Sequence, residues 1–257
     1  MPVTPQDRLD HAQALRPLAL LATGSTGADI ERLVREARAR ARRERRSLTW
    51  QDIERSMTAS ARPPHATLDW QIAVHELGHA VVCTVLGIGT VSTIRIGGRG
   101  GQVDTDLDVT ELQDEDGLMK LIAATLAGRA AEKIVLGKVG IGAGGTVDSD
   151  LARATQLALE AETSLGLGEE MPLLYRPPSN GSDMLNYDPN LARRVNRRLE
   201  AAEQIALGIL ERHRDIILSF AKRLCGCRVM EGIEVLEVIV GSDDGSTASE
   251  TAIQKSE

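Results

Sequence analysis

The chain has 257 residues, of which 42% are hydrophobic and 26% charged, and this composition is typical of a folded protein with one large domain or two small ones. Its net charge of -7 argues against a protein whose main task is to hold nucleic acid, because that task usually needs a basic surface. No run of about 18 apolar residues occurs and the N-terminus lacks a secretory pattern, so we expect a cytoplasmic chain without its own membrane span.

Two further features of the composition bear on the fold. Aromatic residues make up only 2% of the chain, so the core must consist mainly of Ala, Leu, Ile and Val, and this favours a mainly α fold. The spacing of Cys83, Cys225 and Cys227 fits neither a redox motif nor a zinc motif, so we expect three reduced thiols.

The first predicted elements are helices. Residues 7–22 have loosely helical apolar spacing, and residues 27–47 carry one apolar stripe surrounded by arginines. Thr49 and Asp52 resemble a capping box that begins a further short helix. Prolines follow in 58–69, so we expect a helical subdomain over 1–58 and a linker over 59–69.

The remainder, residues 70–240, predicts a helical domain with a small β-sheet. The alternating β-branched residues 91–96 indicate a strand, and the glycine-rich turn after it leads toward a second one. Asp148 or Ser149 is placed to cap the helix that begins at Asp150. The other predicted helices cover 70–86, 115–136, 191–213 and 214–224, and the acidic tail 241–257 is expected to be disordered.

The motif His75-Glu76-Leu77-Gly78-His79 is the candidate for chemistry. On a helix, residues i and i+4 share a face, so the two imidazoles can bind one tetrahedral ion while Glu76 points to the adjoining flank. The alternative is a buried helix in which two histidines happen to lie one turn apart. A catalytic zinc needs a third protein ligand, and the spacing alone leaves four carboxylates open, namely Glu132, Asp148, Asp150 and Glu160.

Several motifs in the same order resemble the peptidase domain of the FtsH-type AAA proteases. "VHELGHAVV" is similar to the family's "HEAGHA" helix, "LAGRAAEKIVLG" to its "GGRxAEExxFG" helix, and "DSDLARATQLA" to its "xxDLxxATxLA" helix. The likeness covers most of residues 67–240. It implies a zinc endopeptidase in which His75, His79 and Asp150 bind Zn²⁺, Glu76 acts as the general base, Glu132 is a supporting carboxylate and Asp148 is a cap.

The resemblance also carries expectations about substrates and assembly. It implies unfolded or membrane-derived polypeptide substrates and a homo-oligomer, a hexameric ring, at the cytoplasmic face of the inner membrane if a segment outside this chain provides the anchor. We further expect the strand residues Ile94, Arg95 and Ile96 to bind an extended substrate by strand addition. The competing hypothesis is a module of the same fold that binds zinc and a partner but is weakly active or inactive.

The N-terminal part is similar to the helical lid of an AAA ATPase, since "TGADIERLVREARARARRE" resembles "SGADLxxLVNEAxxxAxR". This implies that Gly27, Ala28 and Asp29 lie where such a lid approaches nucleotide. The chain contains no phosphate-binding loop of the G-x-x-x-x-G-K-[ST] type, so we expect an absent ATPase module to supply ATP hydrolysis. The rival reading of the segment Arg32 to Arg46, a nucleic-acid contact, is disfavoured by the acidic chain.

Two departures from the family pattern stand close to the predicted site. Leu77 replaces the small residue of "HEAGH", which would put a larger side chain near the metal face. "GGTVDSDL" replaces "STGAxxDL", which could reshape the loop before Asp150.

Overall fold

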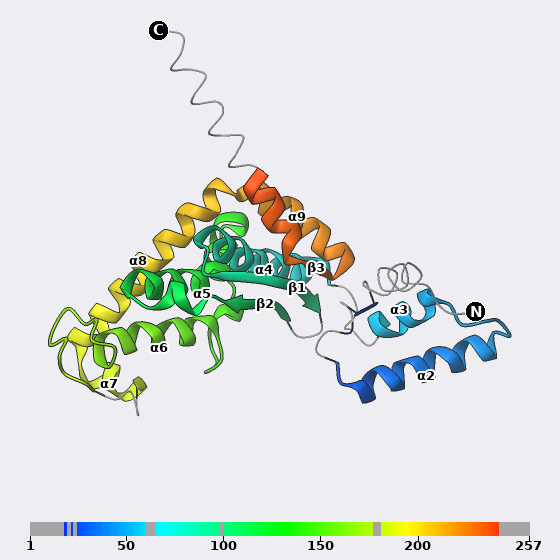
Figure 1. Cartoon of the computed structure of the whole chain (residues 1–257), viewed down its shortest axis with the longest axis horizontal. Helices are drawn as coiled ribbons and strands as arrows, with labels where there is room; N and C mark the ends of the chain where they lie inside the picture. The colour runs from blue at the N-terminus through cyan, green and yellow to red at the C-terminus, as the bar shows by residue number, and fades with distance from the viewer. Residues whose placement is uncertain are drawn as a thin grey trace, which may run out of the picture.

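A computed structural model describes residues 18–19, 22, 25–59, 65–97, 100–176 and 181–241. The described chain is mainly helical with a small β-sheet, as the sequence predicts, and the sheet has three antiparallel strands (Figure 1). Most of the predicted helix 7–22, the centre of the predicted linker and the predicted tail beyond residue 241 lie outside the described residues.

The N-terminal elements are the helices α2 (Gly27–Arg43) and α3 (Trp50–Ala59), which pack together beside the rest of the molecule (Figure 1). Thr26 caps α2 in a capping box with Asp29, and the expected stripe buries Leu33 and Ala37. Asp52 accepts hydrogen bonds from the backbone N–H and the hydroxyl of Thr49.

Two long helices form the centre of the larger part. α4 (Ala66–Leu86) packs along α5 (Glu115–Leu136), and both end at a glycine with a left-handed backbone conformation, Gly87 and Gly137. α4 begins four residues before the predicted start at Trp70. The reason is His65, an uncommon N-cap residue whose side chain accepts a hydrogen bond from the backbone of Leu68.

Small residues let α4 and α5 approach closely. A Cβ at Gly78 would lie 2.5 Å from the backbone oxygen of Ala127 and 2.6 Å from the Cβ of Ala131, so only glycine fits at this crossing. The close crossing brings the face of α4 that carries the two histidines against α5.

The sheet has the strand order β2-β1-β3. β1 (Gly89–Gly97) pairs with β2 (Gly100–Leu107) on one side and with the short strand β3 (Val229–Glu231) on the other. The sequence patterns do not predict β3, because three residues are too few to show a strand periodicity. The 3₁₀-helix η1 (Val109–Leu112) links β2 to α5.

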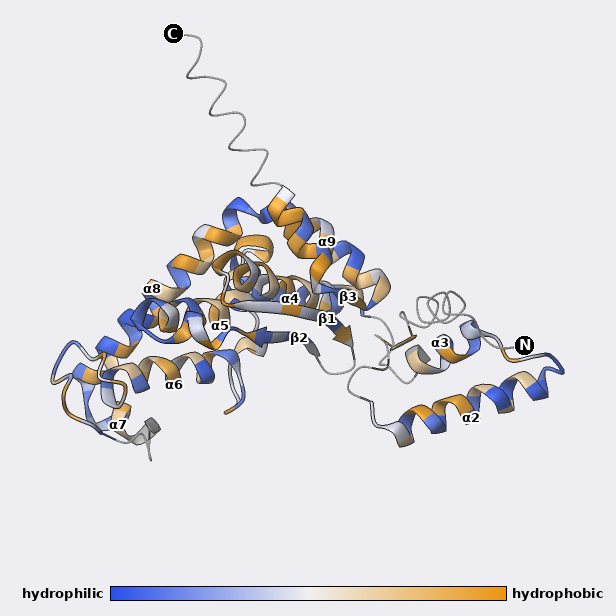
Figure 2. Ribbon diagram, viewed as in Figure 1, coloured by the Kyte–Doolittle hydropathy of each residue, from blue (hydrophilic) through white to orange (hydrophobic). Residues whose placement is uncertain are grey.

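The remaining helices enclose the core. η2 (Ile141–Ala143) precedes α6 (Asp150–Thr163), and α8 (Pro189–Arg212) and α9 (Arg214–Cys227) cover α5 and α4. The short helix α7 (Gly181–Tyr187) lies before α8, and residues 232–241 are also helical. Hydrophobic residues gather where α4, α8 and α9 pack, whereas α2 alternates apolar and polar positions (Figure 2).

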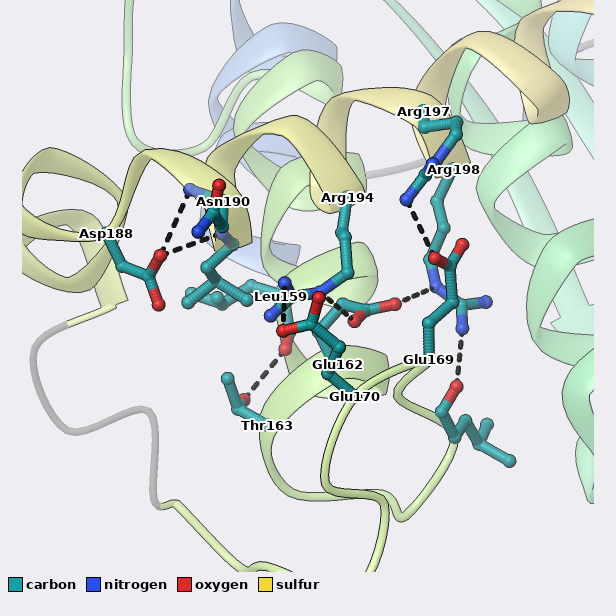
Figure 3. Close-up of polar contacts among 12 residues, drawn as sticks. Leu159, Glu162, Thr163, Glu169, Glu170, Asp188, Asn190, Arg194, Arg197 and Arg198 are labelled. Carbon is teal, nitrogen blue, oxygen red and sulfur yellow. Dashed lines mark hydrogen bonds and ion pairs between the residues drawn. The ribbon is translucent and has the colours of Figure 1, made fainter.

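A buried ion-pair cluster joins α6 to α8 (Figure 3). The fully buried Glu162 carboxylate accepts from Arg194 Nε at 2.9 Å and from Arg198 Nε at 2.7 Å. Arg194 also pairs with Glu170 at 2.9 Å, and Arg198 Nη2 donates to the Leu167 carbonyl at 2.5 Å. These bonds fix the segment after α6 against α8.

No helix in the described part of the chain is both long and apolar enough to cross a membrane.

Candidate metal centre

Three side chains from two helices converge at one point. His75 and His79 lie one turn apart on α4, and Asp150 lies in the first turn of α6. His75 Nε2 is 3.0 Å from Asp150 Oδ2, His79 Nε2 is 3.4 Å from the same oxygen, and the two Nε2 atoms are 3.2 Å apart. Among the histidine, cysteine and acidic side chains of the described residues, these three lie close enough together to bind one ion.

The spacing of the three ligand atoms fits a tetrahedral zinc ion. Zn–N and Zn–O bonds of about 2.0–2.1 Å at tetrahedral angles place ligand atoms about 3.3 Å apart. The observed separations of 3.0, 3.2 and 3.4 Å surround that value. Two imidazoles and one carboxylate leave a fourth position open, which is the arrangement of a catalytic rather than a structural site.

The second ring nitrogen of each histidine is held by a hydrogen bond. His75 Nδ1 is 2.8 Å from Glu132 Oε1, and His79 Nδ1 is 2.8 Å from the carbonyl oxygen of Ala124. Because both acceptors lack a proton to donate, each imidazole keeps a hydrogen on Nδ1 and directs Nε2 toward the site. α5 therefore sets the orientation of both rings.

The charges of the site are strongly coupled. Burial disfavours the charged form of His75, but its hydrogen bonds to Asp150 and Glu132 outweigh burial and raise its pKa to about 10. Burial also opposes ionisation of Asp150, yet hydrogen bonds from the two histidines hold the pKa of Asp150 well below its usual range. Without a metal ion, a proton therefore lies between the His75 imidazole and the Asp150 carboxylate. A bound cation can replace that proton.

Gly128 of α5 lies directly against the two imidazoles. A Cβ at this position would be 2.5 Å from Nε2 of His75 and 2.5 Å from Nε2 of His79. The glycine therefore leaves space open at the two nitrogen atoms that face the site.

Glu76 lies on the adjoining flank of α4 and is only 8% exposed. This burial raises the pKa of its carboxyl group. It contacts β2 closely, because a Cβ at Gly101 would lie 2.6 Å from Glu76 Oε1. This carboxylate and the three-residue cluster border the same cavity, which has a volume of about 950 Å³.

The cavity extends as a groove along α4. Its lining includes Gly100, Gln102 and Thr105 of β2 and several residues of the segment between α5 and α6. Residues of α4 line the cavity from Leu68 to Cys83, so the cavity extends along the helix on both sides of His75. A groove open along a strand can accept an extended chain.

The other carboxylates considered as third ligands take different places. Glu132 bonds the far side of the His75 ring, and Glu160 bonds Gln156 on α6. Asp148 borders the cavity but is not the cap, since Ser149 caps α6 by accepting from the Ala152 backbone. Of the two caps that the sequence offers, Ser149 is therefore confirmed, and the choice of Asp148 that the resemblance implies is wrong.

The two departures from the family pattern leave the cluster intact. Leu77 is fully buried in the hydrophobic core and does not border the cavity, so its expected position near the metal face is wrong. It lies two positions after His75, which turns it to another side of the helix. The altered loop before α6 still brings the Asp150 side chain to both histidines.

The structure does not support a substrate strand at Ile94, Arg95 and Ile96. β1 is the central strand, and these positions already pair with β2, while Ile94 and Arg95 pair with β3 and the Ile96 N–H bonds to the Arg228 carbonyl. Ile94 and Ile96 are also buried. The strand next to the groove is β2, which pairs only with β1 among the described strands.

Sequence reasoning missed three residues that touch the site. Gly101 lies in the predicted glycine-rich turn and Gly128 in the "LAGRAAEKIVLG" segment. Neither could be assigned to the site from the sequence, because close approach to another element is a property of the folded chain. Gln71 precedes His75 by one helical turn, and this spacing was a usable signal.

Comparisons with known proteins agree with this geometry. The sequence profile of peptidase family M41 matches residues 68–238. The chain is 32% identical to ATP-dependent zinc metalloprotease FtsH 4 of Synechocystis sp., with 89% of this chain and 40% of that protein covered. It is 33% identical to ATP-dependent zinc metalloprotease FtsH of Thermotoga maritima, with 82% of this chain and 37% of that protein covered.

The chain thus spans about two fifths of the length of these relatives. The family match covers the helices that carry His75, His79 and Asp150, together with the sheet beside them. On this match, the chain belongs to peptidase family M41.

Proposed function

We propose that this chain is a zinc-dependent endopeptidase in which His75, His79 and Asp150 hold the ion and Glu76 is the general base. The observation that carries the proposal is the convergence of three ligand atoms 3.0–3.4 Å apart beside a fourth, buried carboxylate in one groove. The relatives are named as zinc metalloproteases, which agrees with this chemistry.

Zinc bound there would polarise the scissile carbonyl and lower the pKa of a water molecule toward about 7. The Glu76 carboxylate would accept a proton from the attacking water and pass that proton to the leaving amine. Burial raises the pKa of Glu76, and this direction favours a carboxylate that accepts a proton and later releases it.

The edge of β2 supports a proposal for substrate binding. An extended polypeptide could pair with this edge and lie over Glu76, since Gly101 brings β2 against that carboxylate. Recognition through backbone hydrogen bonds requires an unfolded segment and reads few side chains. We therefore propose unfolded polypeptides as the substrate class. The relatives are named ATP-dependent, and we propose that an ATPase module delivers the polypeptide to this chain.

Zinc content and cleavage of a short fluorogenic peptide test the proposal without depending on an unfolding module. The full chain should bind one zinc, and Glu76→Gln should keep the zinc while cleavage falls by at least about 100-fold. Glu160→Gln, the same change at a carboxylate of α6 that accepts a hydrogen bond from Gln156, should cleave normally.

The ligand assignment is tested in parallel. Asp150→Asn should lose zinc, whereas Asp148→Asn, which alters another cavity carboxylate, should retain it. Retention of zinc by Asp150→Asn, or of cleavage by Glu76→Gln, would refute the proposal. Zinc without cleavage in the wild type would instead favour a binding module of the same fold.

A further inference from the structure

The carboxylate that orients His75 is itself held by two donors. Glu132 Oε1 is bonded to His75 Nδ1, and its other oxygen, Oε2, accepts from Gln71 Nε2 at 3.1 Å and from the Gly140 backbone N–H at 2.5 Å. Glu132 is 2% exposed. All three recorded bonds fix the plane of the carboxylate, and so the direction in which Oε1 meets the imidazole.

Gln71 is packed tightly in this arrangement. It lies one helical turn before His75 on α4 and borders the same cavity. A Cβ at Gly140 would lie 1.9 Å from Gln71 Nε2 and 2.9 Å from Glu132 Oε2, so the glycine leaves room for the amide. The amide therefore joins α4, α5 and the segment after α5 at one carboxylate.

We propose that Gln71 is a positioning residue of the metal centre, acting on His75 through Glu132. This inference rests on the proposed function. With the amide in place, Glu132 Oε2 is occupied and Oε1 remains directed at the His75 ring. Without it, Oε2 keeps one of its two donors, the Gly140 N–H, so the carboxylate is held less firmly and gives the imidazole less support in its tautomer and orientation.

Gln71→Met tests the role, because methionine keeps a similar length but cannot donate a hydrogen bond. We expect the zinc dissociation constant of the full chain to rise about tenfold, within the range for losing support of a metal ligand. Gln156→Met is the matched control. That glutamine also donates to a glutamate, Glu160, at 2.8 Å, but on the exposed face of α6, and its change should leave zinc affinity within about twofold of wild type.

A double-mutant cycle with Glu132→Gln separates positioning from general packing. If Gln71 acts through Glu132, Gln71→Met should add less than about twofold to the dissociation constant of the Glu132→Gln chain. The metal-free forms of wild type and Gln71→Met should unfold at similar urea concentrations, because the change is meant to act on the metal site.

Three outcomes would overturn the inference. These are an unchanged zinc affinity in Gln71→Met, an equal loss in the Glu132→Gln background, and a loss explained by metal-free unfolding. A wild-type chain that binds no zinc would refute the proposed function itself and this inference with it, so the two failures are distinguishable.

Discussion

Replacing Gly128 by alanine should remove the metal site while leaving the fold in place. The added Cβ would be 2.5 Å from both Nε2 atoms, whereas ordinary van der Waals contact begins at about 3.4 Å. Relief of the clash therefore needs a movement of about 0.9 Å by the rings or by α5. Zn–N distances vary by only about 0.2 Å, so a shift of this size removes at least one histidine from coordination.

The expected loss exceeds that for an outer hydrogen bond, which costs about 10–100-fold. We therefore expect zinc affinity to fall at least about 100-fold, or about 2.8 kcal/mol. The assay is competition for zinc against a chelator of known affinity, with circular dichroism as the check on helix content.

Gly208→Ala is the matched control, because it makes the same change inside α8, where a Cβ would meet no atom within 4 Å. It should leave zinc affinity unchanged and stabilise the helix by up to about 1 kcal/mol. If Gly128→Ala bound zinc within about threefold of wild type, the proposed placement of the ion beside this glycine would be wrong.

Two further predictions concern stability. Glu162→Gln should lower the free energy of unfolding by about 3–5 kcal/mol in urea denaturation, because it leaves buried arginines without their charged partner. Glu169→Gln, at an exposed pair with Arg197, should cost less than about 1 kcal/mol, and equal effects would contradict the assigned role of burial. In the metal-free chain, protonated His75 contributes stability that is fully present below about pH 6.5 and is lost as the pH rises through about 10. Urea denaturation of wild type minus that of His75→Gln should show this fall, and a difference independent of pH would refute it.

The sequence predicts the helices of the fold well wherever a local signal ends them. α5 follows its predicted bounds because Asp114 caps it and Gly137 ends it. β3 could not be predicted in the same way, since its three residues become a strand only by pairing with β1, far earlier in the chain.

The residues of the site also differ in whether a local sequence signal predicts them or only the packing of the folded chain does. Helical spacing alone places His75 and His79 together, but it does not choose among the downstream carboxylates. An acidic residue in the first turn of a helix is favoured by the helix dipole anyway, so Asp150 had no local signature of a ligand. Its position follows from the packing of α6 on α5, and the family resemblance supplied the register that local physics lacked.

The placement of β1 between two partners has a consequence for solubility and synthesis. If β3 were missing, β1 would lose its partner strand along Thr93, Ile94 and Arg95, and this edge of a strand with buried isoleucines would be open. Such an edge is a template for aggregation. A nascent or truncated chain that ends before Val229 thus exposes an aggregation-prone edge beside its own hydrophobic core, because β3 is made after β1 and protects it.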